Sequence, residues 1–580
     1  LSCFKSSPNP VVEDFPLLTL MLSEMNLLIH EQLKRSNVLN YCNFQSTSNL
    51  RADTLSDCRE LEAMLRVISG RTSSYSVALR SLSTKLTPDD AVDPAWASAM
   101  PYNKIPGPSV TMMLSGILFQ GQTKDLSIMD MHRIMRDSYG DLVRVPGVLG
   151  RKDTLMSFSP DDYEKLFRTE GQWPNRRGMD TFVYYRNKVR PDVFKGMGGL
   201  VNEQGESWQR FRTIVNPVMM QPKTIRLYVD KLDAVAREFM EVIHNLRNEK
   251  NEMPGDFHHW LNRWALETIG VLALDTRFGC LEKELSNDSR DIIKYIREVF
   301  QLTWKLDVLP SIWKFYKTST FNKLMALLDE LTRIVMSKVD EAIIRMENNP
   351  TQSSDSQSVL EKLLKVDRHV AVVMAFDMLM AGVDTTTSAT TSILYCLAKN
   401  PDKQAKLRDE LRAILPKRDS PLTPDNMRNL PYLRACIKEG LRMYSPIAGN
   451  IRAAGKDLVL QGYQVPKGTD VALASIIMYH EDKHFPRGGE FLPERWLKDE
   501  PESTGCPSAK NAHPFLFLPF GFGPRACIGL RMANLEMELL VARITRQFEY
   551  RWNYDELKLV SSLVNIPENE LRFEMVEADE

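Results

Sequence analysis

The sequence predicts a mainly α-helical protein with a minor β component (α+β), in which one large domain spans residues 100–580. Composition supports this, because 43% of the 580 residues are hydrophobic and 26% are charged, as in soluble globular proteins. Apolar residues recur at spacings of three and four along several long segments, which indicates helices that bury one face. Strand-like patterns are strongest in one region, residues 458–474.

The predicted domain begins at Met100–Ser109, a Pro- and Gly-rich segment typical of a boundary. The β-rich runs within residues 458–474 are punctuated by Gly462 and by a Pro-Lys-Gly turn at residues 466–468. Long amphipathic helices are predicted over residues 223–247, 289–305, 321–346, 370–399 and 430–443.

Charge, cysteine content and hydropathy exclude several classes of protein. The 74 basic and 75 acidic residues give a net charge of −1, whereas a nucleic-acid binder carries a basic excess. The eight cysteines are sparse and irregularly spaced, which is not the pattern of a disulfide framework. The longest apolar run, Val370–Val383, contains Asp377 and is shorter than the roughly 20 residues of a membrane span. We therefore expect a buried core helix there and no transmembrane anchor.

The first 99 residues divide at Met64. Residues 1–63 are an extension to which no function is assigned. The following segment is rich in Arg and Ser and lacks acidic residues, which is the composition of a mitochondrial transit peptide; a basic linker is the alternative. We expect residues 64–99 to be this transit or linker segment, with Met64 as an initiator. Its cations are Arg66, Arg71, Arg80 and Lys85.

One cysteine near the C-terminus has the surroundings of a metal ligand. Cys527 lies between a Gly-rich loop and the start of an apolar helix, within FLPFGFGPRACIGLRMANLE (Phe517–Glu536). A helix N-terminus and nearby Arg525 both lower the pKa of a thiol and favour the thiolate. Gly521 and Gly523 let the backbone turn tightly beneath a flat ligand, and Arg525 is placed to reach a carboxylate of that ligand.

The segment FGFGPRACIG resembles the heme-binding signature of the cytochrome P450 family at every fixed position. The resemblance covers residues 101–575 and implies the P450 fold, with heme b whose iron takes the Cys527 thiolate as axial ligand. A thiolate ligand favours O–O cleavage. The matching residues are Phe520, Gly521, Gly523, Arg525, Cys527 and Gly529.

Two further motifs of the family follow the same order. Glu439-x-x-Arg442 and Arg495 of FLPERW are similar to the family's buried Glu–Arg–Arg network, which we interpret as structural. Removing one partner from a buried pair costs roughly 3–5 kcal/mol. Glu330-x-x-Arg333 has the same spacing and predicts only an exposed helical ion pair.

Trp208 and Arg212 are spaced four apart and share one helical face. In isolation such a pair predicts cation–π packing at the surface. The resemblance implies instead that both contact a heme propionate, and that Arg452 is a further contact.

The segment AGVDTT, residues 381–386, interrupts an apolar helix with poor helix formers. A Thr hydroxyl can bond back to a helix carbonyl and open a groove beside Gly382. The resemblance places Asp384 and Thr385 next to the dioxygen site as a proton relay. This acid–alcohol pair favours oxygen activation over the rearrangement of peroxides.

The sequence contains no flavin or iron–sulfur motif, so electrons must arrive from another protein. Two cations are candidates for its docking site. Arg434 and Lys438 are four residues apart and lie on one stripe of their helix. The chain resembles the mitochondrial class of animal, insect-type P450s, whose basic pair binds an acidic, adrenodoxin-like [2Fe–2S] ferredoxin. A solvated basic face is the alternative.

The segment Asp307–Lys317 combines aromatic and basic residues between two predicted helices. Such a composition suits contact with a membrane interface; a buried hinge is the alternative. The residues concerned are Trp313, Lys314, Phe315, Tyr316 and Lys317.

The predicted function is therefore a heme-thiolate monooxygenase on the matrix side of the inner mitochondrial membrane, bound there peripherally. It inserts one oxygen atom from O₂ into an apolar substrate, steroid-like or xenobiotic. Electrons come from NADPH through a ferredoxin reductase and ferredoxin. The alternatives are a peroxide isomerase or dehydratase of the same fold, and a heme- or sterol-binding protein without turnover.

Overall fold

The computed structural model describes residues 92–113, 127–348, 357–498, 505–561 and 563–579. The chain divides into two compact units, Leu1–Thr87 and Pro88–Glu580, and all described residues belong to the second. Residues 1–63, Met64 and the rest of the predicted transit segment up to residue 91 lie outside the described residues.

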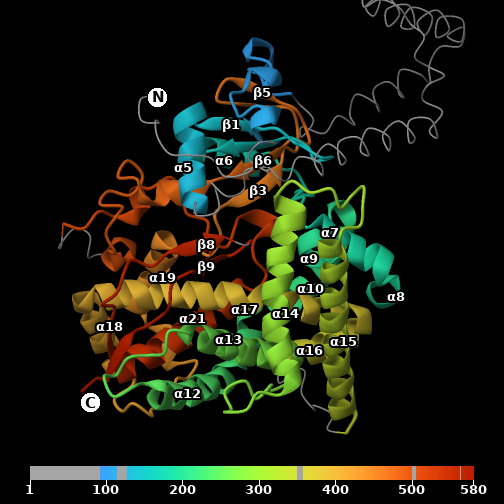
Figure 1. Cartoon of the computed structure of the whole chain (residues 1–580). Coiled ribbons are helices and arrows are strands. Elements are labelled where there is room, and N and C mark those ends of the chain that lie inside the picture. Colours follow the sequence, from blue (N-terminus) through green and yellow to red (C-terminus); the bar gives the residue numbers. More distant parts are fainter. Residues whose placement is uncertain (1–91, 114–126, 349–356, 499–504, 562, 580) are drawn as a thin grey trace, which may run out of the picture. The chain divides into compact units, whose positions relative to one another are not determined.

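Helices dominate the described unit (Figure 1). They are α5 (Ile128–Tyr139), α6 (Pro160–Arg168), α7 (Asp180–Tyr184), α8 (Pro191–Phe194), α9 (Gly199–Asn202), α10 (Gly205–Met219), α11 (Pro222–Arg226), α12 (Val229–Leu246), α13 (Phe257–Leu274), α14 (Asn287–Thr303), α15 (Ser319–Asn348), α16 (Val359–Val366), α17 (Arg368–Lys399), α18 (Pro401–Ile414), α19 (Pro431–Met443) and α21 (Leu530–Gln547).

The strands form one sheet and three two-stranded ribbons. The sheet has the order β1-β2-β6-β3, with β2 and β6 parallel and the outer pairs antiparallel. The ribbons pair β4 with β5, β7 with β10 and β8 with β9. The strands are β1 (Leu142–Val145), β2 (Thr154–Ser157), β3 (Asn450–Ala453), β4 (Leu458–Leu460), β5 (Tyr463–Val465), β6 (Asp470–Leu473), β7 (Phe548–Arg551), β8 (Leu559–Ser561), β9 (Asn565–Pro567) and β10 (Glu574–Glu577).

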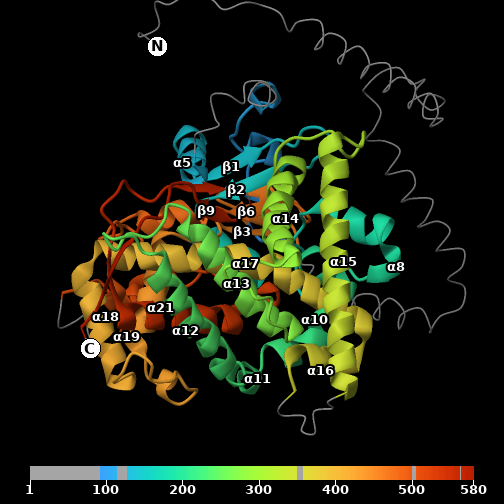
Figure 2. The same cartoon turned by 60° about the horizontal axis from the view of Figure 1, so that its bottom comes forward.

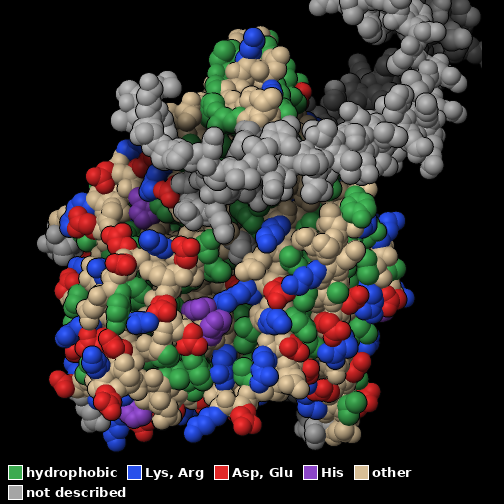
Figure 3. All heavy atoms as spheres, viewed as in Figure 1, with side chains coloured by type: hydrophobic (Ala, Val, Ile, Leu, Met, Phe, Trp, Pro, Cys, Tyr) green, Lys and Arg blue, Asp and Glu red, His purple; other side chains and the backbone are tan. Residues whose placement is uncertain are grey.

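The core has two parts. The larger one lies among the helices, where α13 packs on α17, α12 packs on α21, and α17 also contacts α19 and α21. The smaller one lies between the four-stranded sheet and α6. Figure 2 shows α14 and α15 side by side, next to the other helices of the larger core. Lys and Arg are interspersed with Asp and Glu on the face drawn in Figure 3.

Most predicted helices are present, with two differences. The predicted helix 223–247 is broken into α11 and α12 at Leu227 and Tyr228, whose backbone N–H groups donate to carbonyls three residues earlier. Tyr228 is buried there, and its hydroxyl accepts a hydrogen bond from Val359 N at 2.8 Å. The predicted helix 289–305 changes at Trp304 into a π-helical turn, η6 (Trp304–Val308). α17 begins at Arg368, since Asp367 caps it by accepting from His369 N and Val370 N.

α17 is the core helix expected from its sequence. Within the described residues it is the one helix long and apolar enough to cross a membrane, yet 78% of its most apolar window is buried inside the protein. The folded unit begins earlier than the predicted boundary at residue 100. Asp93 is 9% exposed, pairs with Lys165 at 2.5 Å and accepts from Val459 N at 3.0 Å.

Candidate active site

The Cys527 loop, residues 520–529, contains the short turn η11 (Gly523–Arg525) and leads into α21. Cys527 N donates to Phe520 O at 2.8 Å, which closes the loop. Gly521 and Gly523 have φ values of +73° and +67°, a region that glycine enters without a Cβ clash. A Cβ on Gly523 would also lie 3.1 Å from Glu170 Oε1.

The Cys527 thiol is solvent-accessible, yet burial by surrounding protein raises its pKa. Both observations hold for a sulfur that faces a hollow within the protein. The backbone N–H groups of Gly529 and Leu530 donate to the sulfur, and the charges of Arg212 and Arg176 also favour the thiolate. The predicted lowering of the thiol pKa is therefore outweighed by burial in the protein without its ligand.

The guanidinium of Arg525 is held by the protein itself. It is 4% exposed and lies 3.9 Å from the centroid of the Trp208 ring. Four of its N–H groups are engaged, so it braces the loop, and its contact with a ligand carboxylate stays a prediction. The acceptors are Pro174 O (2.9 Å), Leu200 O (3.2 Å), Glu203 O (2.8 Å) and Gln204 Oε1 (2.9 Å).

Four arginines gather near the Cys527 loop: Arg176, Arg212, Arg452 and Arg525. Burial, and then repulsion among these charges, lowers the pKa of Arg525 to about 9; burial and repulsion from Arg452 and Arg212 lower that of Arg176 to about 10. Arg452 is paired within the protein, because Glu170 accepts from its Nε at 2.8 Å, and its contact with a propionate stays a prediction. The cluster keeps an excess of positive charge, which favours an anionic ligand.

Unpaired donors indicate which residues fit the carboxylates of heme. Trp208 Nε1 and Arg212 Nε, both on α10, are buried without a hydrogen-bond partner. Arg212 Nη2 donates to Ala526 O at 3.0 Å. Arg176 is a site residue that sequence reasoning missed. Its signal is the pair in WPNRRG, but the sequence does not distinguish it from Arg177, which pairs with Asp470 at 3.4 Å.

The predicted relay residues lie in the middle of α17. Thr385 Oγ1 donates to Ala381 O at 2.6 Å, as expected for a Thr that bonds back to its helix. Ala381 is exposed within an otherwise buried helix, so this turn faces open space. Burial raises the pKa of Asp384 to about 6, and the charge of Arg297 opposes that rise.

A buried carboxyl links α17 to the helix that follows Cys527. Glu536 of α21 accepts from Thr268 Oγ1 at 2.6 Å and from Thr386 Oγ1 at 3.3 Å. Thr386 directly follows Thr385. The bundle therefore holds the turn with the acid–alcohol pair against the helix whose first residue, Leu530, lies three positions after Cys527.

The Glu–Arg–Arg residues are brought together in the interior. Glu439 accepts from Arg442 Nη2 at 2.7 Å and from Arg495 Nε at 3.0 Å, and all three side chains are 0% exposed. Trp496 Nε1 (2.8 Å) and Leu492 N (3.0 Å) also donate to the Glu439 carboxylate. By contrast, Glu330 and Arg333 form a 2.9 Å pair with both side chains at least half exposed.

The two cations predicted for partner docking have different surroundings on α19. Arg434 donates to Glu538 Oε1 at 3.0 Å and to the carbonyls of Arg428 and Met427. Lys438 is exposed and lies 5.7 Å from the centroid of the Trp496 ring. Lys438 is thus the more accessible charge, while Arg434 also ties α19 to α21.

The aromatic residues of Asp307–Lys317 divide between core and surface. Trp313 is 5% exposed and stacks on Phe321 at 5.2 Å, whereas Phe315 and Tyr316 are 72% and 68% exposed. Lys317 Nζ lies 4.8 Å from the Trp313 ring centroid. The segment therefore combines features of both the predicted hinge and the predicted interface.

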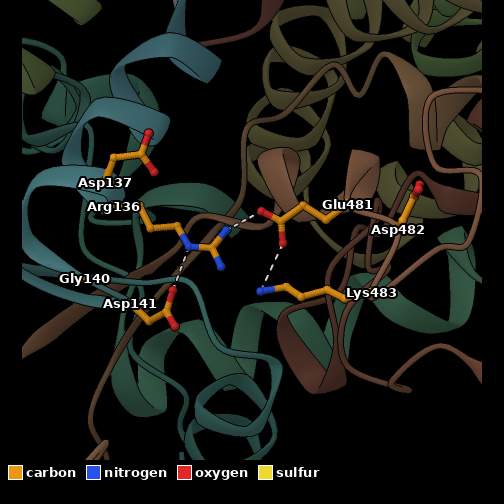
Figure 4. A pocket seen from close by; sticks show the side chains of 7 residues that line it. All are labelled: Arg136, Asp137, Gly140, Asp141, Glu481, Asp482 and Lys483. Carbon is orange, nitrogen blue, oxygen red and sulfur yellow. Dashed lines mark hydrogen bonds and ion pairs between the residues drawn. The ribbon is translucent and has the colours of Figure 1, made fainter.

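A separate surface hollow lies between α5 and the loop after His480 (Figure 4). Arg136 crosses it, donating to Asp141 Oδ1 at 2.6 Å and pairing with Glu481. Lys483 pairs with Glu481 at 3.2 Å. Arg136, Asp141, Glu481 and Lys483 thus pair with one another, and none of the predicted site residues lines the hollow.

The chain is similar to known proteins of one family. The family model "Cytochrome P450" matches residues 106–570. "Cytochrome P450 12b1, mitochondrial" of Drosophila acanthoptera is 44% identical over 463 residues, which cover 79% of this chain and 87% of that protein. "Cytochrome P450 CYP12A2" of Musca domestica is 42% identical over 501 residues, covering 84% and 93%.

The fold is also found in solved structures. The cytochrome P450DA heme domain superposes with a TM-score of 0.65 at 20% identity and covers 83% of this chain and 98% of its own. At that identity the likeness concerns the fold alone. The family match and the curated relatives show that this chain belongs to the cytochrome P450 family of heme-thiolate monooxygenases.

Proposed function

We propose that this P450 is a mitochondrial monooxygenase that inserts one oxygen atom from O₂ into an apolar, steroid-like or xenobiotic substrate, with heme b as its cofactor. The observation that carries the proposal is the acid–alcohol pair of α17, because Thr385 and exposed Ala381 face open space and burial raises the pKa of Asp384 to about 6. An acid with a pKa near the working pH transfers protons efficiently in both directions.

The site residues divide into those that hold the heme and those that handle protons. Bound heme supplies dioxygen activation at an iron held by Cys527. Arg212 and Arg176 stabilise the thiolate, and the unpaired N–H groups of Trp208 and Arg212 are available to the propionates. Thr385 has its proton committed to Ala381 O, so its oxygen can accept a hydrogen bond from a group in the open space. Asp384 gives up and regains a proton beside it.

Isotope labelling tests the proposal. Full-length protein is combined with ferredoxin, ferredoxin reductase and NADPH under heavy-isotope O₂, using apolar ligands selected by a shift of the heme Soret band. We expect one heavy oxygen atom in the product. Rearrangement of an added hydroperoxide without NADPH would favour the isomerase, and ligand binding without NADPH consumption would favour the non-turnover protein.

We propose that ferredoxin docks on α19 through Lys438, with Arg434 contributing less. Lys438→Glu should slow the first electron transfer, and added salt should slow the wild type, because surface attraction is screened within about 10 Å at 0.1 M salt. The swap Arg434→Glu/Glu538→Arg keeps the internal pair and provides the control. If the swap slows reduction as much as Lys438→Glu, Arg434 is an equal docking residue; if neither variant slows it, the docking site lies elsewhere.

The proposed location rests on two features. Curated relatives 42–44% identical to this chain carry the word mitochondrial in their names, and residues 64–91 have the composition of a transit peptide. Exposed Phe315 and Tyr316 support peripheral contact with the matrix side of the inner membrane. Phe315→Ser/Tyr316→Ser should reduce sedimentation with anionic vesicles, and unchanged sedimentation would exclude this segment from the contact.

A further inference from the structure

The α9–α10 junction, residues 199–204, contacts both the helix that carries Asp384 and the loop that carries Cys527. Leu200 N donates to Asp377 Oδ2 of α17 at 3.1 Å. Leu200 O accepts from Arg525 Nη1 at 3.2 Å. One residue of α9 therefore joins α17 to the side chain two positions before Cys527.

Asp377 and Asp384 lie on the same face of α17. Seven residues make nearly two turns of an α-helix, about 10 Å along its axis. A shift of α17 at Asp377 is therefore transmitted to the turn with Asp384 and Thr385. The α9–α10 junction also contacts the loop of Arg176, because Gln204 Nε2 donates to Arg176 O at 2.7 Å.

Arg186 fixes the Asp377 carboxylate from a second element, the π-helical turn η5 (Tyr185–Val189). Arg186 and Asp377 form an ion pair with side chains 1% and 10% exposed. Arg186 Nη1 also donates to Gly198 O at 2.6 Å. The guanidinium carbon lies 4.9 Å and 5.3 Å from the ring centroids of Phe194 and Phe376.

Glycine is required where this pair meets α9. Gly199 has φ of +74°, a conformation that L side chains rarely adopt. A Cβ at this position would collide with Arg186 Nη1 and Asp377 Oδ2. The close approach of the Gly199 backbone is what brings Leu200 N within reach of Asp377.

We propose that Arg186, Asp377 and the Gly199–Leu200 backbone form a strut that fixes the position of the Cys527 loop relative to the Asp384–Thr385 turn. Arg186 and Asp377 are positioning residues, which act through Leu200 and Arg525. The inference rests on the proposed function, because it concerns the geometry between the thiolate and the proton relay. Its prediction is that breaking the strut weakens thiolate ligation and coupling even where the fold remains stable.

The decisive variant is Arg186→Met/Asp377→Leu. Replacing a buried ion pair by apolar residues is often neutral for stability, but it removes the acceptor of Leu200 N. We expect a thermal midpoint near that of the wild type. The dithionite-reduced CO complex should lose its thiolate Soret band about fivefold faster, the effect of one lost hydrogen bond, and more NADPH should be diverted into peroxide. Gly199→Ala should give the same faster loss of the Soret band and the same higher peroxide yield while keeping both charges.

Asp340→Asn is the matched control, because it removes an exposed ion pair with Arg368 at the start of the same helix. It should change neither the Soret lifetime nor the peroxide yield. If the double variant and Gly199→Ala both match the wild type in these two readouts, the pair has no positioning role. A failure of the proposed function gives a different result, because the wild-type protein would then consume no NADPH in the presence of ferredoxin.

Discussion

Replacing Glu536 with Gln should stabilise the protein above neutral pH. Glu536 is 2% exposed and its hydrogen-bond donors are two threonine hydroxyls; among the ion pairs of the described residues, none includes it. Burial raises its pKa from 4.5 to about 7, and its bonds to Thr268 and Thr386 oppose the rise. The ionised form is therefore unfavourable in the folded protein.

The sign follows from proton linkage. A carboxyl whose pKa is higher in the folded than in the unfolded state gives stability below pH 4.5, and that stability is lost as the pH rises through about 7. The difference corresponds to about 3 kcal/mol at 1.36 kcal/mol per pKa unit. Glu536→Gln removes the charge and keeps a carbonyl acceptor, so the gain should approach this value above pH 7 and vanish at low pH.

Urea midpoints of the heme-loaded protein, measured between about pH 5 and 8, provide the assay. Glu267→Gln is the comparison. Glu267 lies on α13 and is buried like Glu536, but it pairs with Arg277 and accepts from Cys280 N at 2.8 Å. That variant should be destabilised at neutral pH. A Glu536→Gln variant that is less stable than the wild type above pH 7, or whose stability difference does not change with pH, would refute the reasoning.

Three further predictions concern other parts of the molecule. Glu439→Gln should lower stability by roughly 3–5 kcal/mol, because Arg442 and Arg495 would lose their buried counter-charge; an unchanged yield of heme-loaded protein and an unchanged urea midpoint would contradict this. Thr385→Ala should retain heme and ligand binding but divert NADPH into peroxide, and an unchanged ratio of product to NADPH would remove Thr385 from the relay. Residues 64–99 fused to a fluorescent protein should reach mitochondria, and should remain in the cytosol once the four cations Arg66, Arg71, Arg80 and Lys85 become Gln.

The fold could be predicted from the sequence where a local pattern of residues determines the local secondary structure. Apolar periodicity placed α15 and α17, and Asp377 correctly marked the apolar run as a core helix rather than a membrane span. The break between α11 and α12 was not predicted, and at this break Tyr228 contacts Val359, over a hundred residues away. Short strands such as β1 and β2 were missed, since their pairing is non-local.

The site shows the same division between local and non-local information. The spacing around Cys527 is a local pattern and could be read from the sequence. The partners of a long cationic side chain could not, because a guanidinium binds whichever carbonyl or carboxylate the fold brings near. The sequence thus did not indicate that backbone carbonyls hold Arg525 or that Glu170 pairs with Arg452, and Arg176 was overlooked.

Formation of the reduced CO complex with ferredoxin as the only electron donor tests the central claim most directly. The heme-loaded protein is mixed with CO, NADPH, ferredoxin reductase and [2Fe–2S] ferredoxin, and the Soret band is recorded. A thiolate-ligated heme iron reduced by ferredoxin should give the red-shifted band, and Cys527→His should not. A wild-type band typical of histidine ligation, or a thiolate band that appears with dithionite but never with ferredoxin, would contradict the account.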